Sequence, residues 1–198
     1  MLMQRRMKHV AFLSAACMLK DNPEARKDYW EYDLEISALA PACRDAGIEL
    51  VTRIWDDPDF DASQYDAAVI GTCWDYMQKP AAFEAALEAM AGKTRLLNPF
   101  ETFRWNQRKT YLKDLAARGA PMIPTLWADR ADAATIAGAF DALGSDDIVV
   151  KPVLGGGAWR QARIRRGEAL PAPEMLPIAE CMVQPFLPAV SQEGEYAF

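Results

Sequence analysis

Histidine is nearly absent from this 198-residue sequence, in which His9 is the single example. A metal site with two histidine ligands cannot be built within one such chain, and a Ser/His or Cys/His nucleophile would depend on His9 alone. The four cysteines, at positions 17, 43, 73 and 181, include no C-x-x-C pair. This usage argues against a zinc ribbon and a disulfide scaffold, and it predicts a reduced, cytoplasmic protein.

The sequence also lacks a basic block and a long apolar run. Its 22 Lys and Arg against 28 Asp and Glu give a net charge of −6, which is unfavourable for general nucleic-acid binding. No segment has transmembrane length, so we expect neither a nucleic-acid nor a membrane partner. The start, MLMQRRMKHVAFLSAACML, could be an export signal, but the cysteine usage favours a first β-strand over His9–Ser14.

The composition is that of an ordinary globular protein, with 51% hydrophobic and 25% charged residues, enough for one large or two small domains. In the first half, strand-like and helix-like segments alternate. The predicted strands cover residues 9–14, 48–55, 67–72 and 95–99, and the predicted helices cover 34–47 and 80–92. This order predicts a small doubly wound α/β domain over residues 1–98, with Phe83, Leu87 and Met90 on the buried side of its second helix.

A second domain is predicted over residues 99–198. Its first helix has Tyr111, Leu112 and Leu115 on one side and ends at Gly119. A second helix is predicted over residues 131–144, and extended segments over 122–128, 147–153, 159–166, 180–187 and 193–198. Pro41 in the first domain predicts a kink or a late start for the helix that contains it.

The segment IVVKPVLGGGAWRQARI carries the strongest chemical signal. Lys151 lies on a predicted strand, and three glycines begin four positions later. The N–H groups of Gly155, Gly156 and Gly157 can surround phosphate oxygens because no Cβ intervenes, and Lys151 supplies a point charge. Neither the P-loop nor the dinucleotide motif fits, since these glycines join two strands. A hairpin turn beside a solvent-facing lysine is the alternative.

Three other segments support a nucleotide site. Lys109 lies at a predicted helix start, where a cation can meet phosphate. In MVQPFLPAV, prolines interrupt a strand and leave backbone groups free to contact an adenine edge. Glu195 follows a glycine and could accept hydrogen bonds from ribose hydroxyls. The alternatives are a surface lysine, an ordinary bend and a solvated strand residue.

The motif TCWDY follows the third predicted strand at its carboxyl end, where open α/β sheets bind ligands. Thr72, Trp74, Asp75 and Tyr76 are therefore candidate substrate residues, and Asp75 is the candidate for binding an amine. The alternative is that Trp74 and Tyr76 pack at the boundary between the domains.

Taken together, these segments resemble the ATP-grasp superfamily, on its glutathione-synthetase-like side. TCWDY, RLLNP, WNQRKTYLKDLAARGAPMIPT, IVVKPVLGGGA and MVQPFLPAVSQEGEY occur in family order over nearly the whole chain. The resemblance implies a pre-ATP-grasp domain followed by the first part of an ATP-grasp α+β domain. It assigns Lys109 and Lys151 to the ATP phosphates, Gly155–Gly157 to the flap, Gln184, Phe186 and Leu187 to the adenine hinge, and Glu195 to the ribose.

The resemblance further implies a carboxylate–amine ligase that forms an acyl phosphate, with ATP, a small carboxylate and an amine as its partners. Family members continue into a second subdomain that holds the Mg²⁺ ligands, so we expect this chain to lack metal ligands and to be an inactive N-terminal portion, with a homodimer left open. The alternative is a non-catalytic nucleotide-binding or scaffold module of the same fold. Gly71 and Ala158 depart from the family pattern, which usually has a basic residue and a hydroxyl residue there.

Overall fold

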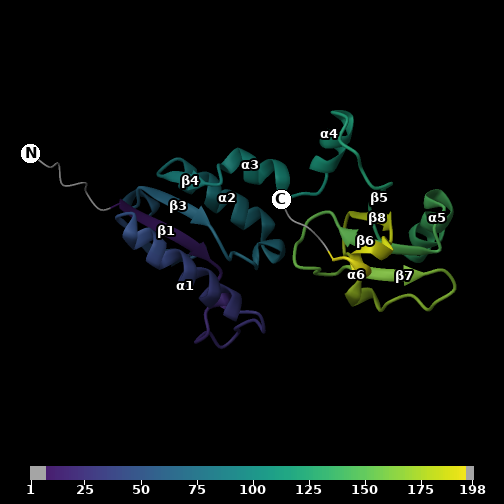
Figure 1. Ribbon diagram of the computed structural model, residues 1–198, viewed down its shortest axis with the longest axis horizontal. Coiled ribbons are helices and arrows are strands. Elements are labelled where there is room, and N and C mark those ends of the chain that lie inside the picture. Colours follow the sequence, from purple (N-terminus) through teal and green to yellow (C-terminus); the bar gives the residue numbers. More distant parts are fainter. Residues whose placement is uncertain (1–7, 195–198) are drawn as a thin grey trace, which may run out of the picture. The chain divides into compact units, whose positions relative to one another are not determined.

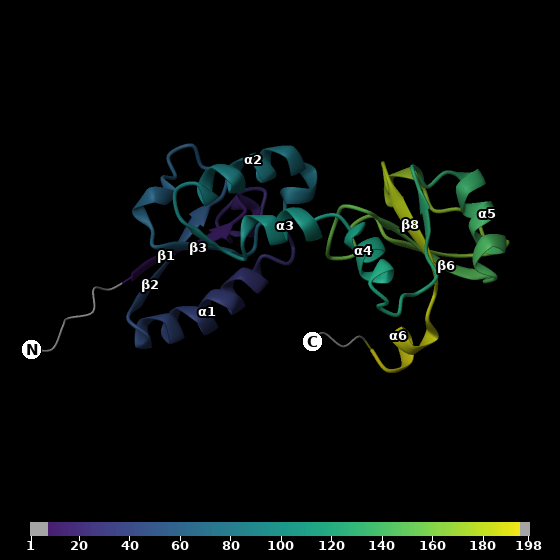
Figure 2. The same cartoon turned by 90° about the horizontal axis from the view of Figure 1, so that it is seen from above.

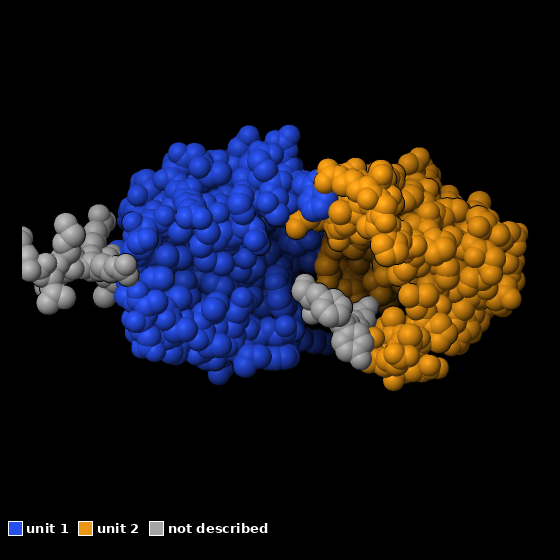
Figure 3. Space-filling model, turned by 45° about the horizontal axis from the view of Figure 1, so that its top comes forward, with its two compact units in different colours: residues 1–105 blue, residues 106–198 orange. Residues whose placement is uncertain are grey.

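The computed structural model describes residues 8–194, and the chain divides into two compact units, residues 1–105 and 106–198 (Figure 3). The strands are β1 Lys8–Ser14, β2 Ile48–Ile54, β3 Ala67–Ile70, β4 Arg95–Leu97, β5 Leu126–Ala128, β6 Asp147–Pro152, β7 Ala162–Arg165 and β8 Cys181–Pro185. The α-helices are α1 Trp30–Asp45, α2 Pro80–Ala91, α3 Phe100–Asn106, α4 Tyr111–Ala117, α5 Ala133–Leu143 and α6 Pro188–Gln192 (Figure 1). Four short 3₁₀ turns cover Ala16–Met18, Ala62–Gln64, Tyr76–Gln78 and Pro173–Met175.

The first unit is built on a parallel sheet with strand order β2-β1-β3-β4. The chain moves outward from β1 to β2 through α1, and outward in the opposite direction from β3 to β4 through α2. Right-handed crossovers in opposite directions place their helices on opposite faces, and Figure 2 shows α1 and α2 on the two sides of the sheet. The predicted doubly wound α/β architecture is confirmed.

The core of this unit lies mainly between the sheet and α2. Phe83, Leu87 and Met90 are buried, as their spacing predicted. Helix α1, in contrast, has no fully buried residue. It begins at Trp30, earlier than predicted, and Pro41 lies inside it. The first turn alternates aromatic and acidic residues, from Trp30 to Asp33, so no apolar stripe marks this start.

The second unit contains an antiparallel sheet with strand order β5-β8-β6-β7. Helix α5 covers one face of it, where Ile136 and Phe140 pack with Ile148, Val150 and Val183. Because side chains alternate along a strand, the residues between these point to the opposite face. Helix α4 lies on that side (Figure 2). The candidate residues Lys151 and Gln184 belong to this second face.

Helix α4 begins at Tyr111, close to the start predicted near Lys109, whereas α3 was not predicted from the sequence. Residues 107–110 separate the two helices, and here the backbone N–H of Lys109 donates to the carbonyl of Val153. One local prediction for the second unit is corrected. The proline-rich stretch after β8 forms α6, with Pro188 at its first position, which suits a helix start. No helix within residues 8–194 is long and apolar enough to cross a membrane.

Gly144 ends α5 in a left-handed conformation, with φ 60° and ψ 35°. We expect Gly144→Ala to destabilise the protein by about 1 kcal/mol, because a Cβ is strained in this region. The matched control is Gly92→Ala at the end of α2, where φ is −74° and a new Cβ would lie 3.6 Å from the nearest atom, Ala89 O. Urea unfolding should show a loss for the first variant and none for the second; equal effects would contradict the conformational explanation.

Candidate functional site

A cavity of about 330 Å³ lies on the α4 side of the antiparallel sheet. Three of the predicted nucleotide residues, Lys109, Lys151 and Gln184, line it together. The other lining residues are mostly apolar: Tyr111, Leu112, Pro121, Met122, Ile123 and Met182. Residues from four separate segments therefore combine two ammonium groups and one amide with an apolar wall.

Lys109 connects the segment before α4 to the glycine turn. Its backbone N–H donates to Val153 O over 2.8 Å, and its ammonium donates to the carbonyl of Gly155. Arg108 forms an isolated antiparallel bridge with Leu154. Burial lowers the pKa of Lys109, and the nearby charge of Lys151 lowers it further. Two cations held at one cavity are a physical signature of an anion-binding site, because an anion would relieve this repulsion.

The glycine turn between β6 and β7 has an unusual backbone. Gly155 and Gly157 have φ of 147° and 57°, and Ala158 and Arg160, which are not glycines, also have positive φ values of 56° and 50°. A Cβ added to Gly155 would lie 3.2 Å from the Pro152 ring, so this position favours glycine on two grounds. The guanidinium of Arg160 ties the far end of the turn to the carbonyl of Leu176 over 2.9 Å.

The residues of the predicted adenine hinge lie in different environments. Gln184 is 5% exposed and lines the cavity, whereas Leu187 is 40% exposed at the start of α6. Phe186 lies under the guanidinium of Arg163, which is 3.3 Å from the ring centroid. Arg163 also forms a bidentate pair with Asp147, at 2.9 and 2.6 Å. Glu195 lies outside the described residues.

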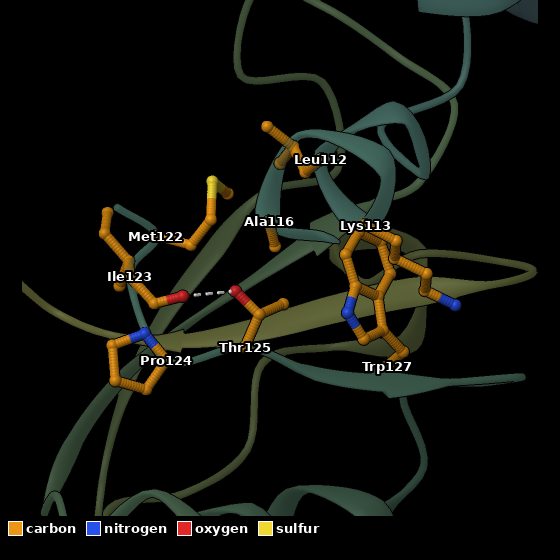
Figure 4. A pocket seen from close by; sticks show the side chains of 8 residues that line it. All are labelled: Leu112, Lys113, Ala116, Met122, Ile123, Pro124, Thr125 and Trp127. Carbon is orange, nitrogen blue, oxygen red and sulfur yellow. Dashed lines mark hydrogen bonds between the residues drawn. The ribbon is translucent and has the colours of Figure 1, made fainter. Parts of the chain in front are cut away.

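A second cavity of about 400 Å³ adjoins the first and shares Leu112, Met122 and Ile123 with it (Figure 4). Lys113 from α4 covers the ring of Trp127 on β5, with its ammonium 4.6 Å from the centroid. No sequence pattern indicates this cavity, because α4 and β5 approach each other only in the folded chain.

In the first unit, the candidate substrate residue Asp75 is already hydrogen-bonded on both oxygens. The indole N–H of Trp55 donates to its Oδ1 over 2.7 Å, and Lys79 donates to its Oδ2 over 3.4 Å. Lys79 also donates to Asp56 over 2.8 Å, which raises the pKa of the ammonium. This network holds the loop between β3 and α2, and Trp55 and Lys79 were not identified from the sequence because Trp55 lies twenty residues away from Asp75.

The other residues of the TCWDY motif are partly or fully buried. The hydroxyl of Thr72 is within 2.8 Å of that of Ser14, and both residues are at most 1% exposed. The backbone carbonyl of Trp74 accepts from Arg26, whose guanidinium lies 5.8 Å from the Trp74 ring centroid. Tyr76 packs in the core of the first unit, and burial raises the pKa of its phenol.

Comparison with known proteins adds sequence and fold evidence to this geometry. Residues 10–98 match the family described as the N-terminal domain of D-cycloserine synthetase DcsG. The cycloserine biosynthesis protein DcsG of Streptomyces lavendulae is 33% identical over 171 residues, which cover 82% of this chain and 57% of that protein. The crystal structure of D-cycloserine synthetase DcsG matches with a TM-score of 0.78 at 29% identity, over 94% of this chain and 62% of that one.

An ATP-grasp ligase, PsnB, was solved with a variant of its minimal precursor, Mg and ADP. It matches 92% of this chain and 66% of its own with a TM-score of 0.53 and 15% identity. The chain therefore shares the fold of this ATP-grasp ligase over most of its length. By name, the proteins that it resembles are a cycloserine biosynthesis protein, a D-cycloserine synthetase and an ATP-grasp ligase. The chain spans 57% of the length of its curated relative.

The cavity that Lys109 and Lys151 line suits a nucleotide better than a metal ion. Its lining has two cations and no carboxylate, so it offers phosphate contacts but not the oxygen ligands that Mg²⁺ prefers. Within residues 8–194 there is no group of three His, Cys, Asp or Glu side chains placed to hold a metal ion.

Proposed function

We propose that this chain binds ATP through its second unit and is the nucleotide-binding part of an ATP-dependent carboxylate–amine ligase. The observation that carries the proposal is the convergence of Lys109 and Lys151 on one cavity, close enough for the charge of Lys151 to lower the pKa of Lys109. A triphosphate supplies the negative charge that would neutralise both ammonium groups. The ADP in the PsnB structure supports a nucleotide as the ligand class.

In the proposed reaction, a carboxylate oxygen attacks the γ-phosphorus of ATP and ADP leaves, which produces an acyl phosphate. An amine then attacks the acyl carbon and phosphate leaves, which forms the amide. The two lysines and the N–H groups of Gly156 and Gly157 are assigned to neutralising and orienting the phosphates, since positioning and charge stabilisation dominate phosphoryl transfer. Mg²⁺, held outside this set of residues, would neutralise the remaining phosphate charge.

The TCWDY loop of the first unit is proposed to contact the carboxylate or amine substrate. Trp74 and Asp75 are its candidate contact residues. Thr72 and Tyr76 are better suited to holding the loop in place, because Thr72 is buried and Tyr76 packs, partly buried, against the core of the first unit. Asp75 would bind an ammonium group only by sharing its oxygens with Trp55 and Lys79.

A nucleotide series tests the proposal directly. Isothermal titration calorimetry should show affinities in the order ATP, ADP, AMP, with each lost phosphate weakening binding about tenfold, because charge-assisted hydrogen bonds to the lysines are lost. Equal affinity for AMP and ATP, or no binding of any of the three, would overturn the proposal. The chain is also expected to bind ATP without hydrolysing it when Mg²⁺ and a carboxylate are added; turnover would show that the catalytic residues are all present.

A further inference from the structure

The cavity that Lys109 and Lys151 line (the lysine cavity) also contains the amide of Gln184 and the phenol of Tyr111. The amide of Gln184 is the group of interest for base recognition. Gln184 lies on β8 opposite Val149 of the neighbouring strand β6, two residues before Lys151, and is 5% exposed. An amide presents a carbonyl acceptor on one side and an amino donor on the other. A carbonyl turned to the cavity can bind a donor of the ligand, whereas an amino group turned to the cavity can bind an acceptor.

Thr125, which precedes β5, determines this orientation. Its hydroxyl donates its only proton to the backbone carbonyl of Ile123 over 2.8 Å (Figure 4). A hydroxyl that has given its proton away can only accept a second hydrogen bond. The neighbouring Gln184 atom, 2.9 Å away, must therefore be the amino nitrogen Nε2. This conclusion follows from counting protons, because the Thr125 hydroxyl has only one and donates it to Ile123.

The carbonyl Oε1 of Gln184 is consequently turned away from Thr125. Gln184 lines the cavity, and with Nε2 turned to Thr125 the amide oxygen Oε1 is the acceptor that this side chain can offer to a ligand there. The remaining N–H of Nε2 can donate beside it, so the amide edge offers an acceptor next to a donor.

This edge matches adenine and opposes guanine. Adenine presents an amino donor, N6, next to the acceptor N7, and an amide pairs with both; guanine presents the acceptors O6 and N7. With the amide held by Thr125, guanine O6 would face Oε1, acceptor against acceptor. Rotation of the amide would relieve this clash, but it would place Oε1 against the hydroxyl oxygen of Thr125, acceptor against acceptor, and break the hydrogen bond between Gln184 and Thr125.

We propose that Thr125 is a positioning residue that makes the nucleotide site select adenine over guanine, acting through Gln184. The inference rests on the proposed nucleotide-binding function and adds the choice of base to it. Thr125 touches the second cavity of Figure 4 and not the first, so its effect on the base is indirect.

The test compares ATP and GTP titrations of the whole chain for three proteins. The wild type should prefer ATP by about tenfold or more, which corresponds to one hydrogen bond made or opposed. Thr125→Val keeps the shape of the side chain but removes the hydroxyl, so the amide can rotate and the ATP:GTP preference should fall by about fivefold to tenfold. Thr125→Ser restores the hydroxyl and should restore the preference. Thermal unfolding of each variant verifies that it is folded.

A double-mutant cycle separates this role from a structural one. In a Gln184→Leu background there is no amide to orient, so Thr125→Val should no longer change the ATP:GTP ratio. A wild type without base preference, a Thr125→Val variant that keeps it, or an undiminished effect in the Gln184→Leu background would each overturn the inference and leave nucleotide binding intact. Absence of binding for both nucleotides in the wild type would instead overturn the proposed function.

Discussion

Replacing Lys151 by methionine should weaken ATP binding by about 10- to 100-fold, because one charged hydrogen-bond donor to phosphate is worth about 1.5–3 kcal/mol. Lys151 lies on β6 and lines the cavity with Lys109. Methionine has a similar length and retains the apolar stem, so the change isolates the charge. Calorimetric titration with ATP measures the loss.

The same variant has a second expected effect, on pH dependence. The pKa of Lys109 is below that of an ordinary lysine, partly because of Lys151. ATP favours the charged ammonium, so affinity should fall as pH rises through the pKa of Lys109. In Lys151→Met the like charge is gone, the pKa of Lys109 rises, and this fall should move to higher pH.

Lys93→Met is the matched control for both measurements. Lys93 is an exposed lysine of the first unit, and its ammonium lies 3.9 Å from Asp61. Its replacement should leave ATP affinity and its pH dependence unchanged. Equal weakening by both substitutions would show that net charge, and not the paired lysines of the cavity, attracts the nucleotide.

Phe83→Ala should destabilise the first unit by about 3–5 kcal/mol, the usual cost of deleting a buried aromatic ring. Phe83 is 1% exposed. Its ring centroid lies 4.9 Å from that of Trp55, 5.2 Å from that of Phe103 and 5.7 Å from that of Tyr76. Through these contacts, the Phe83 ring connects α2 to the residue that follows β2, to α3 and to the TCWDY loop.

Urea unfolding followed by tryptophan fluorescence measures this effect, since Trp55 touches the deleted ring. Leu34→Ala on α1 is the control: Leu34 is 63% exposed, and its truncation should change stability by no more than about 0.5 kcal/mol. A loss below about 1 kcal/mol for Phe83→Ala would contradict the assignment of Phe83 to the centre of this core.

The elements that were predicted correctly are those whose signal is local. The spacing of Phe83, Leu87 and Met90 and the proline at the start of α2 identify that helix without any knowledge of its neighbours. The same is true of α5, where Ile136 and Phe140 are buried and Gly144 ends the helix. Periodicity reports which side of an element is buried, and these two helices bury one side completely.

The features that the sequence could not reveal depend on distant partners. The break between α3 and α4 comes from a hydrogen bond between Lys109 and Val153, which are far apart in the chain. The ring contact of Phe103 with Phe83 places α3 against the core of the first unit.

The candidate site shows the same division between local and distant information. Lys151 and the glycines were found from a local pattern, whereas the cavity that Lys151 and Lys109 both line forms only when the chain folds. Thr125 carries no sequence signal at all, because its significance lies in a hydrogen bond to Gln184 across fifty-nine positions. Residues that orient a binding group are in general harder to find than the group itself.

The pairing of Arg163 with Asp147 has a consequence for solubility. β7 is an outer strand of its sheet, and an outer strand can add a strand from another molecule. β7 has only four residues, and both Arg163 and Arg165 contact Asp147 from it. Two such edges placed side by side would bring four guanidinium groups together, so charge on this short strand protects the protein against edge-to-edge aggregation.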